Sequence, residues 1–225
     1  MNPGLPLYAR SRALPQTLAA LAATTGFAVW AAGALDAYLD PGRRVPVVAL
    51  APLLAAAVIG VSLRSDSDEL DRTAVRPWWP RRLTHLLALT ALASAVLPVA
   101  VAGHAETFGP PAMIRNVLGC VGIVALAAVV LGARLSWLPA FGYVSAAYLA
   151  SSAPHGRAAT VWAWPVQPGA QPGAWAAALA AFALGTALYA VRGGAPRRLT
   201  PRGRGHHAEM PSIRASAASA PYGWR

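Results

Sequence analysis

The chain has 225 residues, of which 56% are hydrophobic and only 12% are charged, and its formal net charge is +11. Soluble domains carry about twice this share of charge, and several apolar runs of about 20 residues are typical of a protein that crosses a membrane repeatedly. All 19 basic residues are arginine. The absence of lysine excludes a P-loop ATPase and a Schiff-base enzyme, because both chemistries need a lysine amine.

The apolar runs predict an all-α fold with six transmembrane helices. In chain order the predicted spans are 13–35, 45–63, 83–102, 112–133, 135–151 and 173–191. The first run lacks a convincing cleavage site, so we expect a retained helix and no signal peptide. A single helix over 112–151 would place Arg134 at mid-membrane at a cost of roughly 3 kcal/mol. We therefore predict two spans joined by a tight turn at Arg134.

The distribution of arginines predicts the orientation. With both chain ends in the cytoplasm, the inner segments hold fifteen arginines and the outer loops hold four, which are Arg43, Arg44, Arg115 and Arg157. This is a clear positive-inside bias. The lead (1–12) and the tail (192–225) are then cytoplasmic, and the Arg-, Gly- and Pro-rich tail is expected to be disordered. The alanine-rich, lysine-free composition is typical of a high-GC bacterial gene, so the expected location is the bacterial cytoplasmic membrane.

One strongly charged stretch, Arg64 to Arg82, lies between the second and third spans. Asp66 or Ser67 can cap a short amphiphilic helix whose carboxylates lie at its positive end, and Pro77 ends that helix. We predict this helix over 65–76, on the inner membrane surface. The residues expected to anchor the inner interface are aromatic or basic: Trp78, Trp79, Arg81, Arg82 and Arg134.

Polar residues within the spans are few, and none is Asp or Glu. Transporters driven by protons or sodium usually carry a carboxylate there, so the chain has no evident energy source of its own. We interpret the small residues as sites of close helix packing, with a substrate path as the alternative; they include Thr24, Thr25, Ser94, Ser145, Gly26, Gly33, Gly119, Gly122 and Gly185.

Metal and cofactor sites are not predicted. Cys120 stands alone in an apolar run and His85 is the one histidine in a span, so both are interpreted as structural residues. His206 and His207 in the tail lack further ligands. The basic tail has little aromatic interleaving and fits anionic lipid better than nucleic acid, and the favoured interpretation is a solvated tail that follows the positive-inside rule.

The order of these elements resembles the membrane subunits of type-2 ABC exporters, in particular the small Ala- and Arg-rich permeases of actinobacteria. The resemblance covers about residues 10–192 and includes the local sequences DELDRTAVRP, ARLSWLP and VWAWPVQPG. In that family six spans have both ends inside, and the loop between spans 2 and 3 forms a coupling helix that docks on the ATPase. The loop between spans 5 and 6 is outer, long and partly re-entrant. The chain departs from the family in its short lead, since a long amphipathic helix usually precedes span 1.

The resemblance implies a permease subunit, not an enzyme, with ATP and Mg²⁺ held by a separate cytoplasmic ABC ATPase. It implies a second permease copy or a sister permease as a further partner. The residues implied in ATPase docking lie in the coupling helix: Asp68, Glu69, Asp71, Arg72 and Arg76. Trp162, Trp164 and Pro165 fall in the implied re-entrant segment on the outer side.

Two other interpretations remain open. Asp66, Asp68 and Asp71 also look somewhat like the first aspartate motif of membrane aromatic prenyltransferases, in which carboxylates hold Mg²⁺ on a diphosphate. That family has a second aspartate-rich loop, whereas this chain offers only Glu106 and Glu209 after Asp71. The other interpretation is an accessory or structural membrane protein without transport activity.

Overall fold

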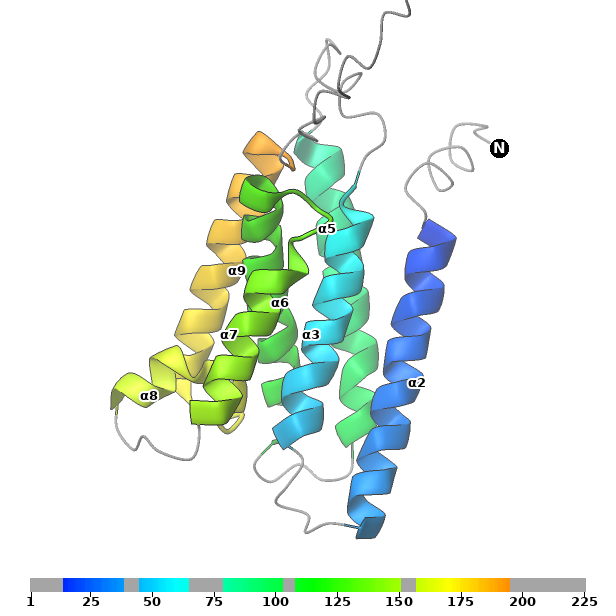
Figure 1. Cartoon of the computed structure of the whole chain (residues 1–225), viewed down its shortest axis with the longest axis vertical. Helices are drawn as coiled ribbons and strands as arrows, with labels where there is room; N and C mark the ends of the chain where they lie inside the picture. Colours follow the sequence, from blue (N-terminus) through cyan, green and yellow to red (C-terminus); the bar gives the residue numbers. More distant parts are fainter. Residues whose placement is uncertain (1–13, 39–44, 65–78, 103–107, 151–156, 195–225) are drawn as a thin grey trace, which may run out of the picture.

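The computed structural model describes residues 14–38, 45–64, 79–102, 108–150 and 157–194, with side chains from 14–34 and from 160 onward in the first and last ranges. Within these ranges every regular element is a helix, as predicted. The elements are α2 (Leu14–Tyr38), α3 (Val45–Ser62), α5 (Trp79–Val96), η2 (Leu97–Val101), α6 (Pro110–Leu131), α7 (Trp137–Ala150), α8 (Arg157–Trp162), η3 (Trp164–Val166) and α9 (Pro172–Arg192). Figure 1 shows the six longer helices side by side in one bundle.

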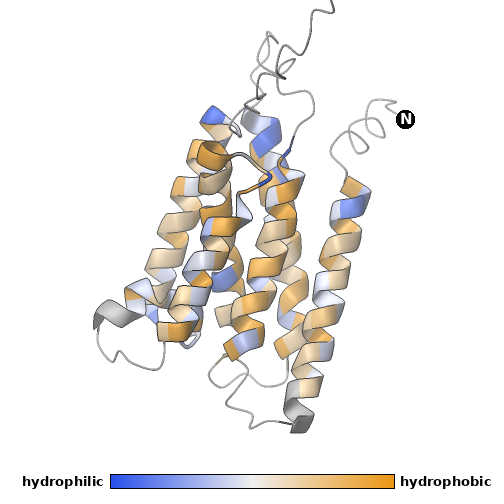
Figure 2. Cartoon of the chain, in the orientation of Figure 1, coloured by the Kyte–Doolittle hydropathy of each residue, from blue (hydrophilic) through white to orange (hydrophobic). Residues whose placement is uncertain are grey.

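Five of the helical segments are long and apolar enough to cross a membrane: 14–34, 45–62, 79–101, 110–131 and 172–192. They match five of the six predicted spans, and Figure 2 shows hydrophobic residues along most of their length. The third begins four residues earlier than the prediction of 83, at Trp79. Trp79, Arg81 and Arg82 therefore belong to the first turn of α5, and the segment before the helix is shorter than expected.

The sixth predicted span, 135–151, corresponds to α7, which has 14 residues. At 1.5 Å per residue this helix is about 21 Å long, shorter than the roughly 30 Å hydrocarbon core. The described chain thus has five helices of spanning length and one shorter helix beside them. Figure 1 shows that α7 runs antiparallel to α6 and that α9 returns to the end of the bundle where α2 starts.

A tight turn separates α6 from α7, so the prediction that 112–151 is not one helix is confirmed. Gly132 has φ +84°, a conformation that side chains with a Cβ rarely adopt, and its N–H donates to the Ala128 carbonyl. Glycine suits this position because it has no Cβ to oppose a positive φ. The Leu135 N–H donates to the Gly132 carbonyl at 3.2 Å. At the other end of α6, Gly109 precedes Pro110 and Pro111, and prolines are favoured at first helical positions.

Helix α6 lies at the centre of the bundle and contacts α3, α5, α7 and α9. Its closest neighbour is α9, where Gly122 and Gly185 face each other. A Cβ on Gly185 would overlap the Gly122 carbonyl, and a Cβ on Gly122 would overlap the backbone of Ala181 and Phe182. Two glycines therefore let the backbones approach closely, as small residues do in membrane proteins. In contrast, only 22% of the most apolar 18-residue stretch of α2 is buried, whereas the corresponding share in α6 is 61%. Helix α2 is therefore peripheral.

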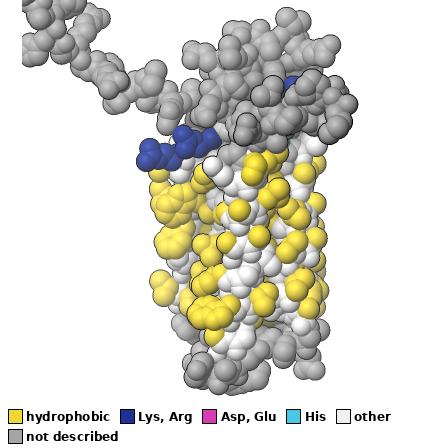
Figure 3. All heavy atoms as spheres, turned by 90° about the vertical axis from the view of Figure 1, so that its right-hand side faces the viewer, with side chains coloured by type: hydrophobic (Ala, Val, Ile, Leu, Met, Phe, Trp, Pro, Cys, Tyr) yellow, Lys and Arg dark blue, Asp and Glu magenta, His cyan; other side chains and the backbone are white. Residues whose placement is uncertain are grey.

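The arginines outside α6 whose side chains the structure describes lie at one end of the bundle, which we call the arginine end, whereas Arg157 begins α8 at the opposite end. Arg64 follows α3, Arg81 and Arg82 begin α5, Arg134 lies in the α6–α7 turn, and Arg192 ends α9. Figure 3 shows basic side chains at the edge of a surface that is otherwise largely apolar. The Arg82 guanidinium lies at Gly193, just past the C-terminus of α9, where a cation is favoured by the helix dipole.

Two glycine-to-alanine substitutions should change the free energy of unfolding in opposite directions. Gly185→Ala should lower the free energy of unfolding by about 1–3 kcal/mol, because its Cβ overlaps the Gly122 backbone. Gly26→Ala meets nothing within 4 Å and should raise it by up to about 1 kcal/mol through helix propensity. Unfolding of the purified protein in mixed micelles measures both. Equal effects of the two substitutions would contradict the packing of α6 on α9.

Candidate functional site

The candidate site is built around two polar residues on α6. Arg115 and Asn116 are the sixth and seventh residues of this helix, which places them about 8 Å inside its start. Both side chains are fully buried. An ionisable side chain at membrane depth is expensive and is a default candidate for a functional role. Arg115 was counted among the outer-loop arginines on sequence; the structure corrects this, because Arg115 lies inside the bundle.

Both side chains donate to the backbone of the segment between α8 and α9. The Arg115 guanidinium donates from Nη1 to the Pro168 carbonyl and from Nη2 to the Gln167 carbonyl, each at 2.7 Å. Asn116 Nδ2 donates to the Pro165 carbonyl at 2.7 Å and to the Val48 carbonyl of α3 at 2.9 Å. Arg115 Nε donates to Asn116 Oδ1 at 3.2 Å, which fixes the two side chains to each other.

Side chains from two further helices complete the set of donors. Tyr143 of α7 donates its hydroxyl to the Trp162 carbonyl. Trp175 of α9 donates Nε1 to the Gly169 carbonyl at 2.8 Å. Side chains of α6, α7 and α9 therefore satisfy five backbone carbonyls between residues 162 and 169, which we call the carbonyl segment.

The prolines of the carbonyl segment explain why other helices supply its hydrogen-bond donors. Pro165 and Pro168 have no N–H, so the carbonyl segment cannot pair all its carbonyls within itself. Its internal bonds include Val166 N–H to the Ala163 carbonyl and Gln167 N–H to the Trp164 carbonyl. Non-helical backbone at membrane depth is tolerated only where it is buried in protein or lines water. The side-chain donors meet this requirement for the carbonyl segment.

Trp164 packs the carbonyl segment into the bundle. Its indole lies against Gly119 of α6, where any Cβ would overlap the ring, and only 3% of the residue is exposed. Its ring centroid is 5.9 Å from that of Tyr143. The Trp164 ring thus occupies the space that a side chain at Gly119 would need. Trp162, two residues earlier, is 39% exposed and faces outward.

Arg115 makes its hydrogen bonds to uncharged oxygens, namely one amide side chain and two backbone carbonyls. Guanidinium is suited to this role because its planar fork bonds two acceptors at once. The geometry anchors the carbonyl segment to α6. Among the described residues, no group of three His, Cys, Asp or Glu side chains gathers as metal ligands would.

The predicted site residues lie in separate places. Trp162, Trp164 and Pro165 come together in α8 and η3, at the end of the bundle opposite the arginine end. Trp79, Arg81, Arg82 and Arg134 lie at the arginine end. Trp78 and the predicted coupling helix, including its docking residues, lie outside the described residues.

A second polar link joins the helices near the arginine end. Ser62 of α3 donates to the Ile59 carbonyl at 2.7 Å and lies 3.3 Å from Nε2 of His85 on α5. The Tyr189 hydroxyl of α9 donates to the Leu63 carbonyl at 3.3 Å. His85 is buried and hydrogen-bonded between helices, which agrees with its interpretation as a structural residue.

Sequence reasoning noticed both halves of the site without joining them. Arg115 and Asn116 fall within the predicted span 112–133, and VWAWPVQPG holds the Trp162, Trp164 and Pro165 of the implied re-entrant segment. The signal that joins them is a pair of strong donors within an apolar run and a proline-interrupted apolar loop that needs donors. No family model, curated protein or solved structure matches the chain.

Replacing Arg115 should release the carbonyl segment. Arg115→Gln removes both bonds to Gln167 and Pro168, and hydrogen bonds to charged groups are worth about 1.5–3 kcal/mol each. A cysteine in place of Ala163, which is 2% exposed, should react slowly with a maleimide in the Cys120→Ala background. In the Arg115→Gln variant we expect labelling at least about tenfold faster.

The matched control is Arg134→Gln, the same change at an exposed arginine, which should leave labelling of residue 163 slow. A cysteine in place of the exposed Ala170 should react rapidly in every background. Unchanged protection of residue 163 in Arg115→Gln would show that the contacts of Asn116, Trp164 and the other donors keep the segment in place without Arg115.

Proposed function

We propose that the chain is the permease subunit of an ATP-driven exporter and docks a separate cytoplasmic ATPase. The observation that carries the proposal is the carbonyl segment, an irregular stretch with only one short 3-10 turn that Arg115, Asn116 and Trp164 hold in one end of an apolar bundle. A purely structural bundle has no need for such a segment, whereas a permease uses irregular backbone to line a path.

The opposite end of the bundle supports the docking part of the proposal. Residues 65–78 connect Arg64 to Trp79, and both of these residues lie at the arginine end. The chain therefore leaves the bundle after Arg64 and returns to it at Trp79 on the face that the positive-inside rule assigns to the cytoplasm. Asp68, Glu69 and Asp71 then contact the ATPase, while Arg72 and Arg76 fix the coupling helix at the membrane surface.

In this proposal α7 makes the sixth crossing of the membrane. Because α7 has only 14 residues, the carbonyl segment fills the part of the outer half of the membrane that α7 does not reach. Two such protomers, or one with a sister permease, form the pathway. Closure of the ATPases pushes on residues 65–76 and rocks the spans between inward-open and outward-open arrangements. The protein then acts in the bacterial cytoplasmic membrane, with both chain ends inside.

Purification of the tagged full chain from its native membrane in mild detergent tests the partner. We expect a P-loop ATPase in near-stoichiometric amount, identified by mass spectrometry. Reversing Glu69 and Asp71 to Lys places like charges at the interface, which costs several kcal/mol, so the retained ATPase should fall at least about tenfold. Asp40→Lys, a reversal in the loop before α3, is the control and should retain it. Recovery of the chain without any P-loop protein would reject the proposal in favour of an accessory membrane protein.

Labelling in intact cells tests the orientation independently. In the Cys120→Ala background, a cysteine in place of Ala170 should react with a membrane-impermeant maleimide added outside. A cysteine in place of Arg134 should react only after the cells are permeabilised. Both positions are exposed and lie at opposite ends of the bundle. The reverse pattern would place the arginine end outside and exclude ATPase docking through residues 65–76.

A further inference from the structure

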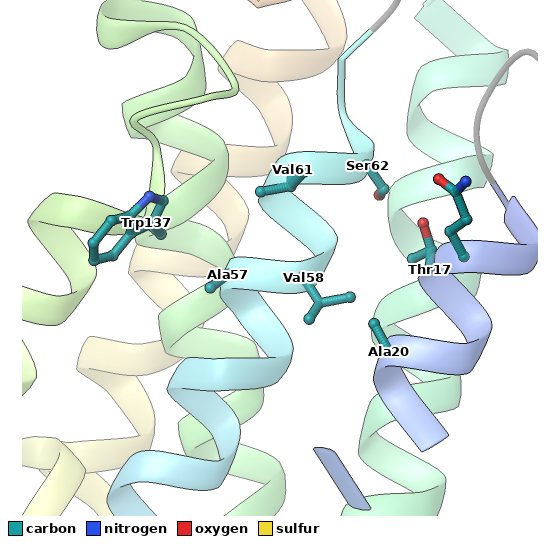
Figure 4. A pocket seen from close by; sticks show the side chains of 8 residues that line it. Thr17, Ala20, Ala57, Val58, Val61, Ser62 and Trp137 are labelled. Atoms are coloured by element: carbon teal, nitrogen blue, oxygen red, sulfur yellow. The ribbon is translucent and has the colours of Figure 1, made fainter. Parts of the chain in front are cut away.

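A groove crosses the outside of α3 near the arginine end, with a volume of about 420 Å³, within the range of small-molecule sites. Figure 4 shows α2 along one side of it, with Thr17 and Ala20, and Trp137 at the start of α7 on the other side. Its floor is apolar and consists of Ala57, Val58 and Val61 of α3. An apolar floor between two membrane-embedded helices is a surface that a hydrocarbon chain covers.

The end of the groove nearest the arginine end is polar. Gln16 and Thr17 of α2 and Ser62 of α3 line it there. The Ser62 hydroxyl already donates to the Ile59 carbonyl, whereas the exposed Gln16 offers an amide that can donate to and accept from a ligand. Trp137 is 36% exposed and lies where tryptophan prefers to be, at the level of lipid headgroups.

Two exposed arginines lie close in the chain to residues that line the groove. Arg64 is exposed and follows Ser62 by two residues, so their Cα atoms are at most about 7.6 Å apart. Arg134 is exposed and precedes Trp137 by three residues within the α6–α7 turn. Basic pockets between transmembrane helices bind anionic lipid headgroups. The groove thus combines an apolar floor and a polar end with arginines two and three residues along the chain from its lining residues Ser62 and Trp137.

We propose that this groove is a binding site for one anionic phospholipid of the bilayer. One acyl chain covers Ala57, Val58 and Val61 between α2 and Trp137. The phosphate lies between Arg64 and Arg134, and Gln16 hydrogen-bonds the headgroup. The bound lipid fills the space beside the first turns of α2. It thereby links this helix, in which only 22% of the spanning window is buried, to the rest of the bundle.

Quenching of Trp137 fluorescence by brominated lipid tests the site. The full chain is reconstituted in phosphatidylcholine bilayers that contain a minor fraction of either brominated phosphatidylglycerol or brominated phosphatidylcholine. The chain has eight tryptophans, so the Trp137 signal is the difference between the protein and its Trp137→Phe variant. We expect this signal to be quenched by the phosphatidylglycerol at a lower mole fraction than by the phosphatidylcholine.

Two variants with matched controls localise the effect. Arg64→Gln should weaken phosphatidylglycerol quenching about fivefold in mole fraction, as expected for the loss of one arginine near the headgroup. Arg192→Gln removes an exposed arginine at the same end but on α9, and should change it little. Ala57→Phe fills the groove and should abolish the preference, whereas Ala180→Phe on the exposed face of α9 should preserve it.

Equal quenching by the two lipids would overturn the proposal, since Trp137 would then report only the general lipid shell. A preference that survives both Arg64→Gln and Ala57→Phe would also overturn it. So would quenching that appears only after residues 1–12 are removed, because the chain itself would then cover the groove. The site does not depend on the transport function: retention of an ATPase with no lipid preference, or the reverse, separates the two proposals.

Discussion

The structure depends on the satisfaction of backbone carbonyls in a stretch of chain that is not a regular helix. Within a membrane a helix pairs its own backbone groups, and any other conformation needs donors from outside. Here Arg115 and Asn116 supply them for Pro165, Gln167 and Pro168. The same Asn116 amide also bonds the Val48 carbonyl, so one pair of adjacent residues connects α6, α3 and the carbonyl segment.

This connection explains why α6 lies at the centre of the bundle. Arg115, Asn116, Gly119 and Gly122 lie within two turns of α6. The first two anchor the carbonyl segment, Gly119 receives the Trp164 ring, and Gly122 admits α9. Because all three contacts use one short stretch, α6 cannot shift relative to α9 without disturbing the segment between them. The end of the bundle opposite the arginine end is therefore its most constrained part, whereas α2 is held by few contacts.

The sequence predicts the helices well because hydrophobic length alone determines a spanning segment. It does not predict which face of a helix meets a neighbour. Of the five glycines interpreted as packing sites, Gly119, Gly122 and Gly185 lie at close approaches, while Gly26 and Gly33 have nothing within 4 Å. Likewise Thr24 and Thr25 bond their own helix at the Ala20 and Leu21 carbonyls. The partnership of Arg115 with a segment about 50 residues later depends on tertiary contacts that no local pattern contains.

The two ends of the bundle differ in how they use arginine. At the arginine end the guanidinium groups are mostly exposed and can exchange water, lipid and protein partners at little cost. Arg115 has no such freedom, because a buried cation that loses its acceptors pays a large desolvation cost. The carbonyl segment is consequently either anchored or released, with few intermediate positions. If the bundle changes shape, the movement is expected in α2 and at the arginine end, while α6, α9 and the carbonyl segment move together as one unit.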